Sequence, residues 1–154
     1  MALPALIITG ASGFVGRHLL DELKSEYRIF ALARRSQHEC GAPVHPNIAW
    51  MHVDIGDRAT LARTFREIAT AGGASYLIHL AAYYDFTGQD HLEYERTNVH
   101  GTRHILELAR ELNLRRVIFA SSVAACAFPS RGSALTEQSP PDGDHIYAWS
   151  KRLG

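Results

Sequence analysis

The stretch Thr9-Gly10-Ala11-Ser12-Gly13-Phe14-Val15-Gly16 decides the fold of this chain. It follows an apolar run at residues 6–8 and opens an amphipathic run, which predicts a strand, a tight glycine turn and a helix. The glycines allow a sharp turn, a close approach of backbone N–H groups to a phosphate, and tight packing of helix on strand. The free N–H groups at the start of the helix also favour an anion. The turn therefore indicates a dinucleotide site, with an ordinary strand–helix turn as the alternative.

Strand-like and helix-like segments alternate along the rest of the chain. The strand-like segments are 5–9, 28–33, 48–53, 76–80 and 116–120. The helix-like segments are 14–25, 57–71, 92–112 and a last one that starts near Ile146. Such alternation predicts βαβ units and an α/β fold with a doubly wound parallel sheet. We expect a single domain over residues 1–154.

Composition and charge narrow the class of protein. The 154 residues are 46% hydrophobic, and 16 basic residues balance 16 acidic ones. A globular protein without a basic face is expected, which argues against nucleic acid as a partner. Cys40 and Cys126 match no metal or redox spacing, and His100 and His104 lack a third ligand, so we expect no metal. Without an apolar run of roughly 20 residues or a secretion signal, a cytoplasmic protein with no membrane partner is expected.

Arg34 follows the second predicted strand, where a dinucleotide site contacts the adenosine ribose. An acidic side chain there would accept hydrogen bonds from the ribose hydroxyls of NAD. An arginine instead suits a 2′-phosphate, so Arg34 favours NADP. The alternative is that Arg34 and Arg35 are solvated surface residues.

Two further strand ends carry candidate cofactor residues. Asp54 can accept a hydrogen bond from an adenine amino group while Ile55 packs on the ring, or the pair can form the turn before a helix capped by Asp57. The small residues of Leu80-Ala81-Ala82 would let a dinucleotide lie over the sheet edge, or would pack under a helix. Both strand ends fit a cofactor that crosses the carboxyl edge of the sheet.

Tyr147 and Lys151 are four residues apart and share one face of the last predicted helix. A nearby ammonium group favours the phenolate, so the phenol can exchange a proton near neutral pH. A serine from Ser121-Ser122 can hold a substrate oxygen beside it. The alternative is an ordinary surface helix.

These stretches together resemble the extended short-chain dehydrogenase/reductase superfamily, the NAD(P)-dependent epimerase/dehydratase group. In family order the matches are Thr9–Gly16, Asp54-Ile55, His79-Leu80-Ala81-Ala82, Asn98-Val99-His100-Gly101-Thr102, Ser121-Ser122 and Tyr147 to Lys151. The resemblance implies a Rossmann-like sheet of five strands in the order 3-2-1-4-5, with the C-terminal strands and the substrate region missing. It implies Ser122, Tyr147 and Lys151 as the catalytic residues. The implied cofactor, NADP or NAD, would contact Gly10, Ser12, Gly13, Phe14, Val15, Gly16, Arg34, Asp54, Ile55, Leu80, Ala81, Ala82, Asn98, Tyr147 and Lys151.

The resemblance implies an oxidoreductase that transfers hydride to or from a small molecule. The run Tyr83–Phe86 is similar to the hydroxysteroid dehydrogenase and flavonol reductase branch, and Ala125-Cys126-Ala127 departs from the sugar-nucleotide pattern. Both features favour a secondary alcohol or ketone over a nucleotide sugar, which remains the alternative. A third possibility is a dinucleotide-binding module that is inactive because it is cut short.

Members of this family are usually considerably longer than this chain. We therefore expect a poorly ordered C-terminus and an exposed apolar face on the helix over Leu92–Leu112. In the full-length form, the resemblance implies a homodimer through that helix.

Overall fold

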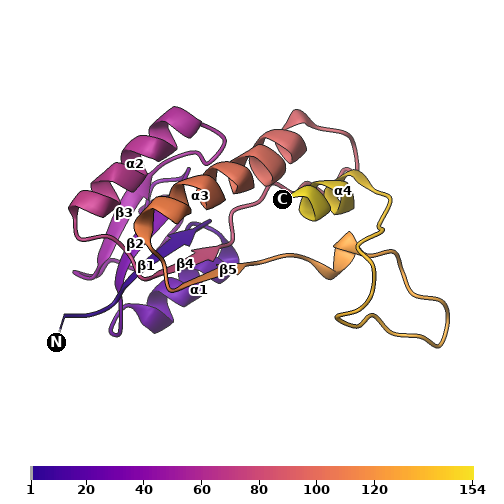
Figure 1. The fold of residues 1–154 in the computed structure, drawn as a ribbon, viewed down its shortest axis with the longest axis horizontal. Helices are drawn as coiled ribbons and strands as arrows, with labels where there is room; N and C mark the ends of the chain where they lie inside the picture. The colour runs from indigo at the N-terminus through magenta and orange to yellow at the C-terminus, as the bar shows by residue number, and fades with distance from the viewer. Residues whose placement is uncertain (1) are drawn as a thin grey trace.

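The computed structural model describes residues 2–154, in which five strands form one parallel sheet (Figure 1). The strands are β1 (Ala5–Thr9), β2 (Arg28–Ala33), β3 (Ile48–His52), β4 (Tyr76–His79) and β5 (Arg116–Phe119). Their order across the sheet is β3-β2-β1-β4-β5, and every neighbouring pair is parallel. The predicted Rossmann-like fold and strand order are confirmed.

Helices connect the strands and lie on both faces of the sheet. They are α1 (Phe14–Leu23), α2 (Arg58–Thr70), α3 (Thr102–Ala109) and α4 (Ile146–Leu153), together with the π-helix η1 (Tyr94–Gly101) and the short 3₁₀ turns η2 (Arg110–Leu112) and η3 (Val123–Ala125). Asp57 caps α2 as predicted, because its carboxylate accepts hydrogen bonds from the N–H groups of Ala59 and Thr60. The segment predicted as one helix over 92–112 contains three helix types in succession: η1 is a π-helix, α3 is an α-helix and η2 is a 3₁₀ turn.

Alternate residues of the buried strands point to opposite faces of the sheet and pack into two separate apolar cores. Ile7 of β1 packs with Phe30 and Leu77 under α2 and α3, whereas Leu6 and its neighbours pack against α1. Figure 1 shows α2 and α3 together on one side of the sheet and α1 on the other. The strands can be apolar on both faces because helices cover both, as parallel sheets require.

The α1 face of the sheet is only partly covered. A groove of about 450 Å³ lies there, with Tyr27, Tyr76 and Ile78 among its lining residues. On the edge strand β5, Val117 is 41% exposed and Ile118 51% exposed. Apolar side chains of this edge therefore remain in contact with water.

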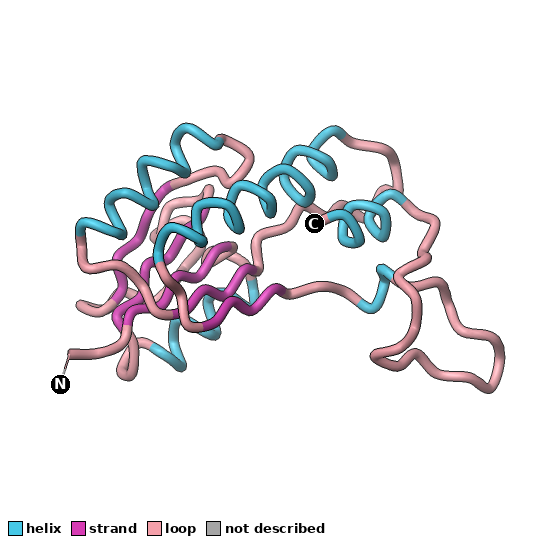
Figure 2. Tube along the Cα trace, in the orientation of Figure 1, coloured by secondary structure: helices cyan, strands magenta, loops and turns pink. Residues whose placement is uncertain are grey.

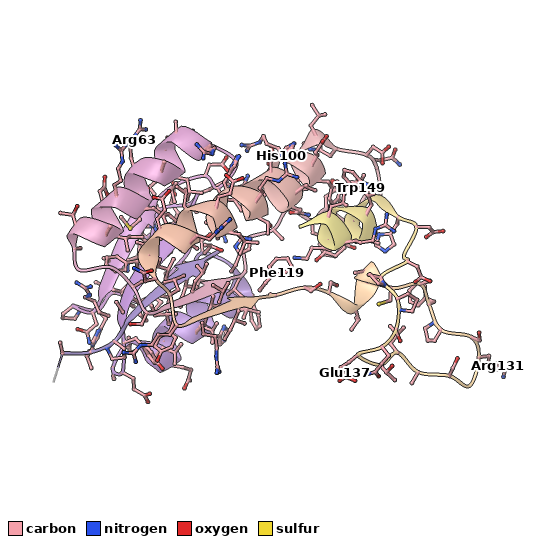
Figure 3. All side chains as sticks on the ribbon, viewed as in Figure 1. Arg63, His100, Phe119, Arg131, Glu137 and Trp149 are labelled. Atoms are coloured by element: carbon pink, nitrogen blue, oxygen red, sulfur yellow. The ribbon has the colours of Figure 1, made fainter. Side chains whose placement is uncertain are left out.

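The chain beyond β5 runs away from the sheet before it returns as α4 (Figure 2). Figure 3 shows Arg131 and Glu137 on this projecting segment, far from the strands. The helix α4 then packs mainly on η1 and η3.

The expectation of an exposed apolar face over Leu92–Leu112 is wrong for most of that segment. The apolar residues of η1 and α3 face inward, because Val99, Ile105 and Leu108 are all buried. The outer side of α3 carries charged residues such as Arg103 and Glu107, and Leu106 is the partly exposed apolar residue of this helix. The segment is amphipathic, and the sheet takes up its single apolar face.

Candidate functional site

A cleft of about 350 Å³ opens at the carboxyl ends of the central strands. It brings together nine of the residues predicted to bind a cofactor, namely Gly10, Ser12, Gly13, Arg34, Asp54, Ile55, Leu80, Ala81 and Ala82. Leu32, Ala33, Arg35, Val53 and Thr97 also line it and were not predicted. Phe14, Val15, Gly16, Asn98, Tyr147 and Lys151, which were predicted, are not part of its lining. The strand ends therefore converge on one cavity, as expected for a parallel sheet.

The glycine turn leaves no room for side chains between β1, β4 and α1. Gly10 has a φ of 69°, and a Cβ added there would lie 2.7 Å from the backbone nitrogen of Ala81. A Cβ added to Gly16 would lie 2.8 Å from the Cα of Ala11. Gly13 precedes α1 without a side-chain cap, so the first N–H groups of the helix receive no such partner. The turn thus presents bare backbone donors, which suit a phosphate.

Two arginines follow β2 at the rim of the cleft. Arg34 is 52% exposed, and its Nη1 lies 3.5 Å from Glu93 Oε2. Arg35 donates a hydrogen bond from Nη2 to the carbonyl oxygen of Ser12, inside the glycine turn. Arg34 therefore reaches toward η1, whereas Arg35 holds the two halves of the rim together. The adjacency of Arg35 to Arg34 was the only sequence signal for this second contact.

Asp54 lies at the end of β3 in an ion pair that the sequence did not reveal. Its Oδ2 accepts a hydrogen bond from Arg96 Nη2 at 2.7 Å, and its Oδ1 accepts one from the N–H of Gly56 at 2.8 Å. Although burial opposes ionisation, the hydrogen bond from Arg96 holds the pKa of Asp54 below its usual value. Both oxygens are thus engaged within the protein, and an adenine amino group would have to share one of them. The contact of Asp54 with adenine stays a prediction.

Ile55 is buried beside η1. A Cβ added to Gly101 would lie 2.7 Å from Ile55 Cγ1, so the side chain occupies the space that this glycine leaves free. His104 Nδ1 lies 3.1 Å from the carbonyl oxygen of Ile55. The packing of Ile55 on an adenine ring also stays a prediction, since much of the residue already contacts protein.

His79 lies in a buried hydrogen-bonded chain between β1 and α3. Thr9 Oγ1 accepts hydrogen bonds from the N–H groups of Leu80 and Ala81, so its hydroxyl hydrogen can point to His79 Nδ1 at 2.5 Å. His79 Nε2 then donates to Thr102 Oγ1 at 3.0 Å. Burial, with the nearby charge of Lys151, lowers the pKa of His79 to about 4. The histidine is therefore neutral, and it fixes the strand ends beside the cleft.

Lys151 projects from α4 toward the end of β5, one helical turn after Tyr147. Lys151 Nζ donates to the carbonyl oxygen of Ala120 at 2.8 Å and lies 4.2 Å from the centre of the Phe119 ring. In Figure 3, Phe119 lies between the strands and α4. Burial lowers the pKa of Lys151 to about 8. The ring of Tyr147 packs edge-on against Tyr84, with 4.8 Å between the ring centres.

Ser122 lies where β5 leads into the η3 turn, which packs on α4. Its Oγ accepts a hydrogen bond from the N–H of Ala124 at 3.2 Å. The hydroxyl hydrogen is thus free to donate to another oxygen. Ser122, Tyr147 and Lys151 come from adjoining elements, and their catalytic roles stay predictions.

Asn98 lies outside the lining of the cleft, and its contact with a cofactor stays a prediction. Its amide pairs with both backbone groups of Tyr83: Oδ1 accepts from the N–H at 2.6 Å, and Nδ2 donates to the carbonyl at 2.9 Å. Nδ2 also lies 2.9 Å from Ser150 Oγ on α4. Asn98 therefore connects η1 to the segment after β4 and to the helix that carries Tyr147.

Residues 2–154 offer neither a metal-ion cluster nor a membrane-spanning helix. This part of the chain contains no group of three or more His, Cys, Asp or Glu side chains placed to hold a metal ion. No helix within it has both the length and the apolar character needed to cross a bilayer.

The sequence over residues 6–154 matches the protein family described as the NAD dependent epimerase/dehydratase family. A putative dihydroflavonol 4-reductase from Synechocystis sp. is 34% identical over 136 residues, which cover 86% of this chain and 37% of that protein. A UDP-glucose 4-epimerase from Streptococcus mutans is 27% identical over 154 residues, which cover 97% of this chain and 44% of that protein. The Bordetella bronchiseptica enzyme WbmG, crystallised with NAD, is 21% identical with a TM-score of 0.85 over 99% of this chain and 48% of that one. This chain thus spans less than half the length of each of these three proteins.

Proposed function

The chain belongs to the NAD dependent epimerase/dehydratase family, and from that premise we propose that its cleft binds a nicotinamide dinucleotide, NADP in preference to NAD. The cleft at the strand ends carries this proposal, because it joins the glycine turn to the ends of β2, β3 and β4. The crowding at Gly10 and Gly16 supports it further, since the turn admits only a backbone there. A pyrophosphate would lie against the first N–H groups of α1.

Arg34 supports the preference for NADP. Its guanidinium is half exposed at the rim of the cleft, directly after β2. A planar group with several N–H donors can hold a phosphate with two parallel hydrogen bonds, whereas it offers no acceptor to a ribose hydroxyl.

We further propose that Tyr147 exchanges a proton with the oxygen of a secondary alcohol or ketone. The bound dinucleotide would supply hydride exchange at its nicotinamide ring. Lys151 follows Tyr147 by one helical turn, so its ammonium group would place a positive charge on the same side of the helix. The free hydroxyl hydrogen of Ser122 would donate to the same substrate oxygen. The oxygen would then be held by two groups that stabilise its developing negative charge.

An apolar alcohol or ketone is favoured by the aromatic residues beside Tyr147. Tyr84 packs against Tyr147 on one side and Phe86 on the other, with ring centres 4.8 Å and 5.0 Å apart. Phe86 is 94% exposed, so this aromatic surface is open to a ligand. The similarity to a putative dihydroflavonol 4-reductase agrees with a reductase.

A nucleotide sugar is the second candidate substrate. The similarity to a UDP-glucose 4-epimerase extends over 97% of this chain, which is more of the chain than the reductase covers. Because this chain spans less than half of each protein, a third reading is a dinucleotide-binding module without turnover of its own.

Fluorescence titration with NADPH and NADH, followed by turnover assays, tests these proposals. We expect both cofactors to bind, with NADPH the tighter. Reduction of aromatic ketones would support the first substrate class, and epimerisation of UDP-glucose the second. Binding without turnover would support the module, and the absence of any binding would refute all three.

Replacement of Arg34 by alanine tests the cofactor preference. We expect Arg34→Ala to weaken NADPH binding about 10- to 100-fold, the range for a lost charge-assisted hydrogen bond, and to change NADH binding little. An unchanged ratio of the two affinities would refute the 2′-phosphate role of Arg34.

A further inference from the structure

A chain of alternating charges runs along the rim of the cleft. Arg96 donates to Asp54 at the end of β3 and also to both carboxylate oxygens of Glu93, at 2.6 Å from Nε and 3.2 Å from Nη2. Thr97 adds a hydrogen bond from Oγ1 to Glu93 Oε2 at 2.8 Å. Arg34 Nη1 lies 3.5 Å from the same oxygen. The rim therefore contains two arginines and two carboxylates in one connected network.

The carboxylate of Glu93 is the fixed member of its pair with Arg34. Its side chain is 20% exposed, against 52% for that of Arg34. The hydrogen bond from Arg96, opposed by burial, lowers the pKa of Glu93, so the carboxylate is charged at neutral pH. Arg34 is instead held by one long contact and is free to turn toward the cleft that it lines.

A 2′-phosphate in this cleft would meet two consequences of Glu93. Arg34 would have to leave its carboxylate partner before it could hold the phosphate. The negative charge of Glu93 would also remain close to the arginine and would reduce the attraction that the phosphate feels. A ribose that carries only hydroxyl groups meets neither cost, because it does not need the guanidinium.

We propose that Glu93 sets the NADP-to-NAD preference of the cleft by restraining Arg34. Glu93 is thus a positioning residue that acts through Arg34 and reduces the discrimination that the arginine alone would give. This inference rests on the proposed dinucleotide site. It concerns the ratio of two affinities, whereas the proposed function concerns whether nucleotides bind at all.

The test compares 2′,5′-ADP with 5′-AMP, which differ only in the 2′-phosphate, by calorimetric titration. Glu93→Gln keeps an acceptor oxygen for Arg96 and Thr97 but removes the charge that holds Arg34. We expect this variant to bind 2′,5′-ADP about two- to fivefold more tightly, the range for one exposed ion pair, with 5′-AMP unchanged.

Glu95→Gln is the matched control for the loss of one negative charge. Glu95 lies on the same turn, is 57% exposed and contacts His100 rather than an arginine of the cleft. The control should bind both nucleotides like the original protein. An equal gain in Glu95→Gln would overturn the proposal, because the effect would then be one of net charge.

A double-mutant cycle with Arg34→Ala isolates the coupling. In the Arg34→Ala background, Glu93→Gln should no longer strengthen 2′,5′-ADP binding. A gain that persists undiminished there, or an unchanged affinity in Glu93→Gln alone, would overturn the inference while 5′-AMP binding still supports the site.

Failure of both nucleotides to bind the original protein would refute the proposed function and this inference with it. If Glu93→Gln does not fold, Glu93→Asp, which withdraws the carboxylate by one methylene, must show a smaller gain of the same sign.

Discussion

His79 is a fully buried residue whose two ring nitrogens both have partners. Thr9 can donate to Nδ1, and Nε2 donates to Thr102, so the neutral ring satisfies all three side chains. A proton on Nδ1 would face the hydroxyl hydrogen of Thr9 and would bring a charge close to Lys151. The network therefore selects the neutral histidine, consistent with a pKa of about 4 against an ordinary value of 6.5.

This difference makes the stability of the domain depend on pH. The unfolded chain binds a proton at His79 below about pH 6.5, but the folded chain does not until about pH 4. The contribution of neutral His79 to the free energy of unfolding is thus complete above pH 6.5 and is lost as the pH falls toward 4. We expect His79 to remove about 2 kcal/mol of unfolding free energy between pH 7 and pH 5. Urea unfolding at the two pH values measures it.

His79→Gln should unfold with a smaller loss between the two pH values, whatever its stability at pH 7. His38→Gln is the matched control, because His38 is exposed on the surface loop after β2. It should retain the pH dependence of the original protein. An equal dependence in His79→Gln and the original would contradict the assignment.

Individual site residues were predictable from sequence where they follow a strand. Gly10 and Arg34 come directly after β1 and β2, and Asp54 comes two residues after β3. The carboxyl ends of parallel strands meet at one edge. The partners of these residues were not predictable in the same way. Arg96 is 42 positions from Asp54, and the packing of η1 against the segment after β3 brings them together. Sequence spacing contains no signal for that pair.

Asn98 links elements rather than contacting the cleft. Its amide pairs with the backbone of Tyr83 and approaches Ser150, so η1, the segment after β4 and α4 share one buried group. We expect Asn98→Ala to loosen α4, because a lost net hydrogen bond is worth about 1 kcal/mol. Amide exchange at residues 148–151 should become about fivefold faster, as measured by hydrogen–deuterium exchange.

Asn47→Ala is the control for the loss of a side-chain amide. Asn47 Nδ2 donates to the carbonyl oxygen of Lys24 at 2.8 Å, just before the edge strand β3. This variant should leave exchange in α4 unchanged. Equal acceleration in both variants would indicate a general loss of stability, and it would contradict a specific link between Asn98 and α4.

The positions of the strands and helices were predicted better than the type of helix that each segment forms. The strands agree with the predicted segments to within one residue, because continuous apolar runs suit a sheet buried on both faces. The π-helical turn over Tyr94–Gly101 was not predicted. Its amphipathic pattern resembles that of an α-helix, so the sequence gives no signal for the wider turn. Gly101, its last residue, packs closely on Ile55.

At the scale of the whole molecule, the least covered part of the sheet is the edge strand β5. Ile118 lines the groove on the α1 face and is half exposed, and the chain carries no net charge to keep molecules apart. We expect the protein to bind the dye ANS and to scatter light at high concentration. Ile118→Lys should lower both signals about twofold or more, because a lysine on an edge strand opposes strand pairing.

Val44→Lys is the matched control for one added charge. Val44 is 87% exposed and lies in the loop before β3, away from this groove. If Val44→Lys lowers ANS fluorescence as much as Ile118→Lys does, the uncovered edge is not the cause. The uncovered edge itself was not predicted, since the sequence placed the exposed apolar surface on the segment over 92–112.

The close contact between Gly10 and Ala81 has a consequence for the order in which the domain can be made. The glycine turn leaves the ribosome early, but the wall that faces it belongs to a strand that follows some 70 residues later. A chain that is still short of β4 has the sequence motif without the cavity. If the cleft binds a nucleotide as proposed, that ligand can stabilise only nascent chains that have already paired β1 with β4. The ligand would therefore act late in folding: it would stabilise chains whose strands are already correctly paired, and it would not help the strands to pair.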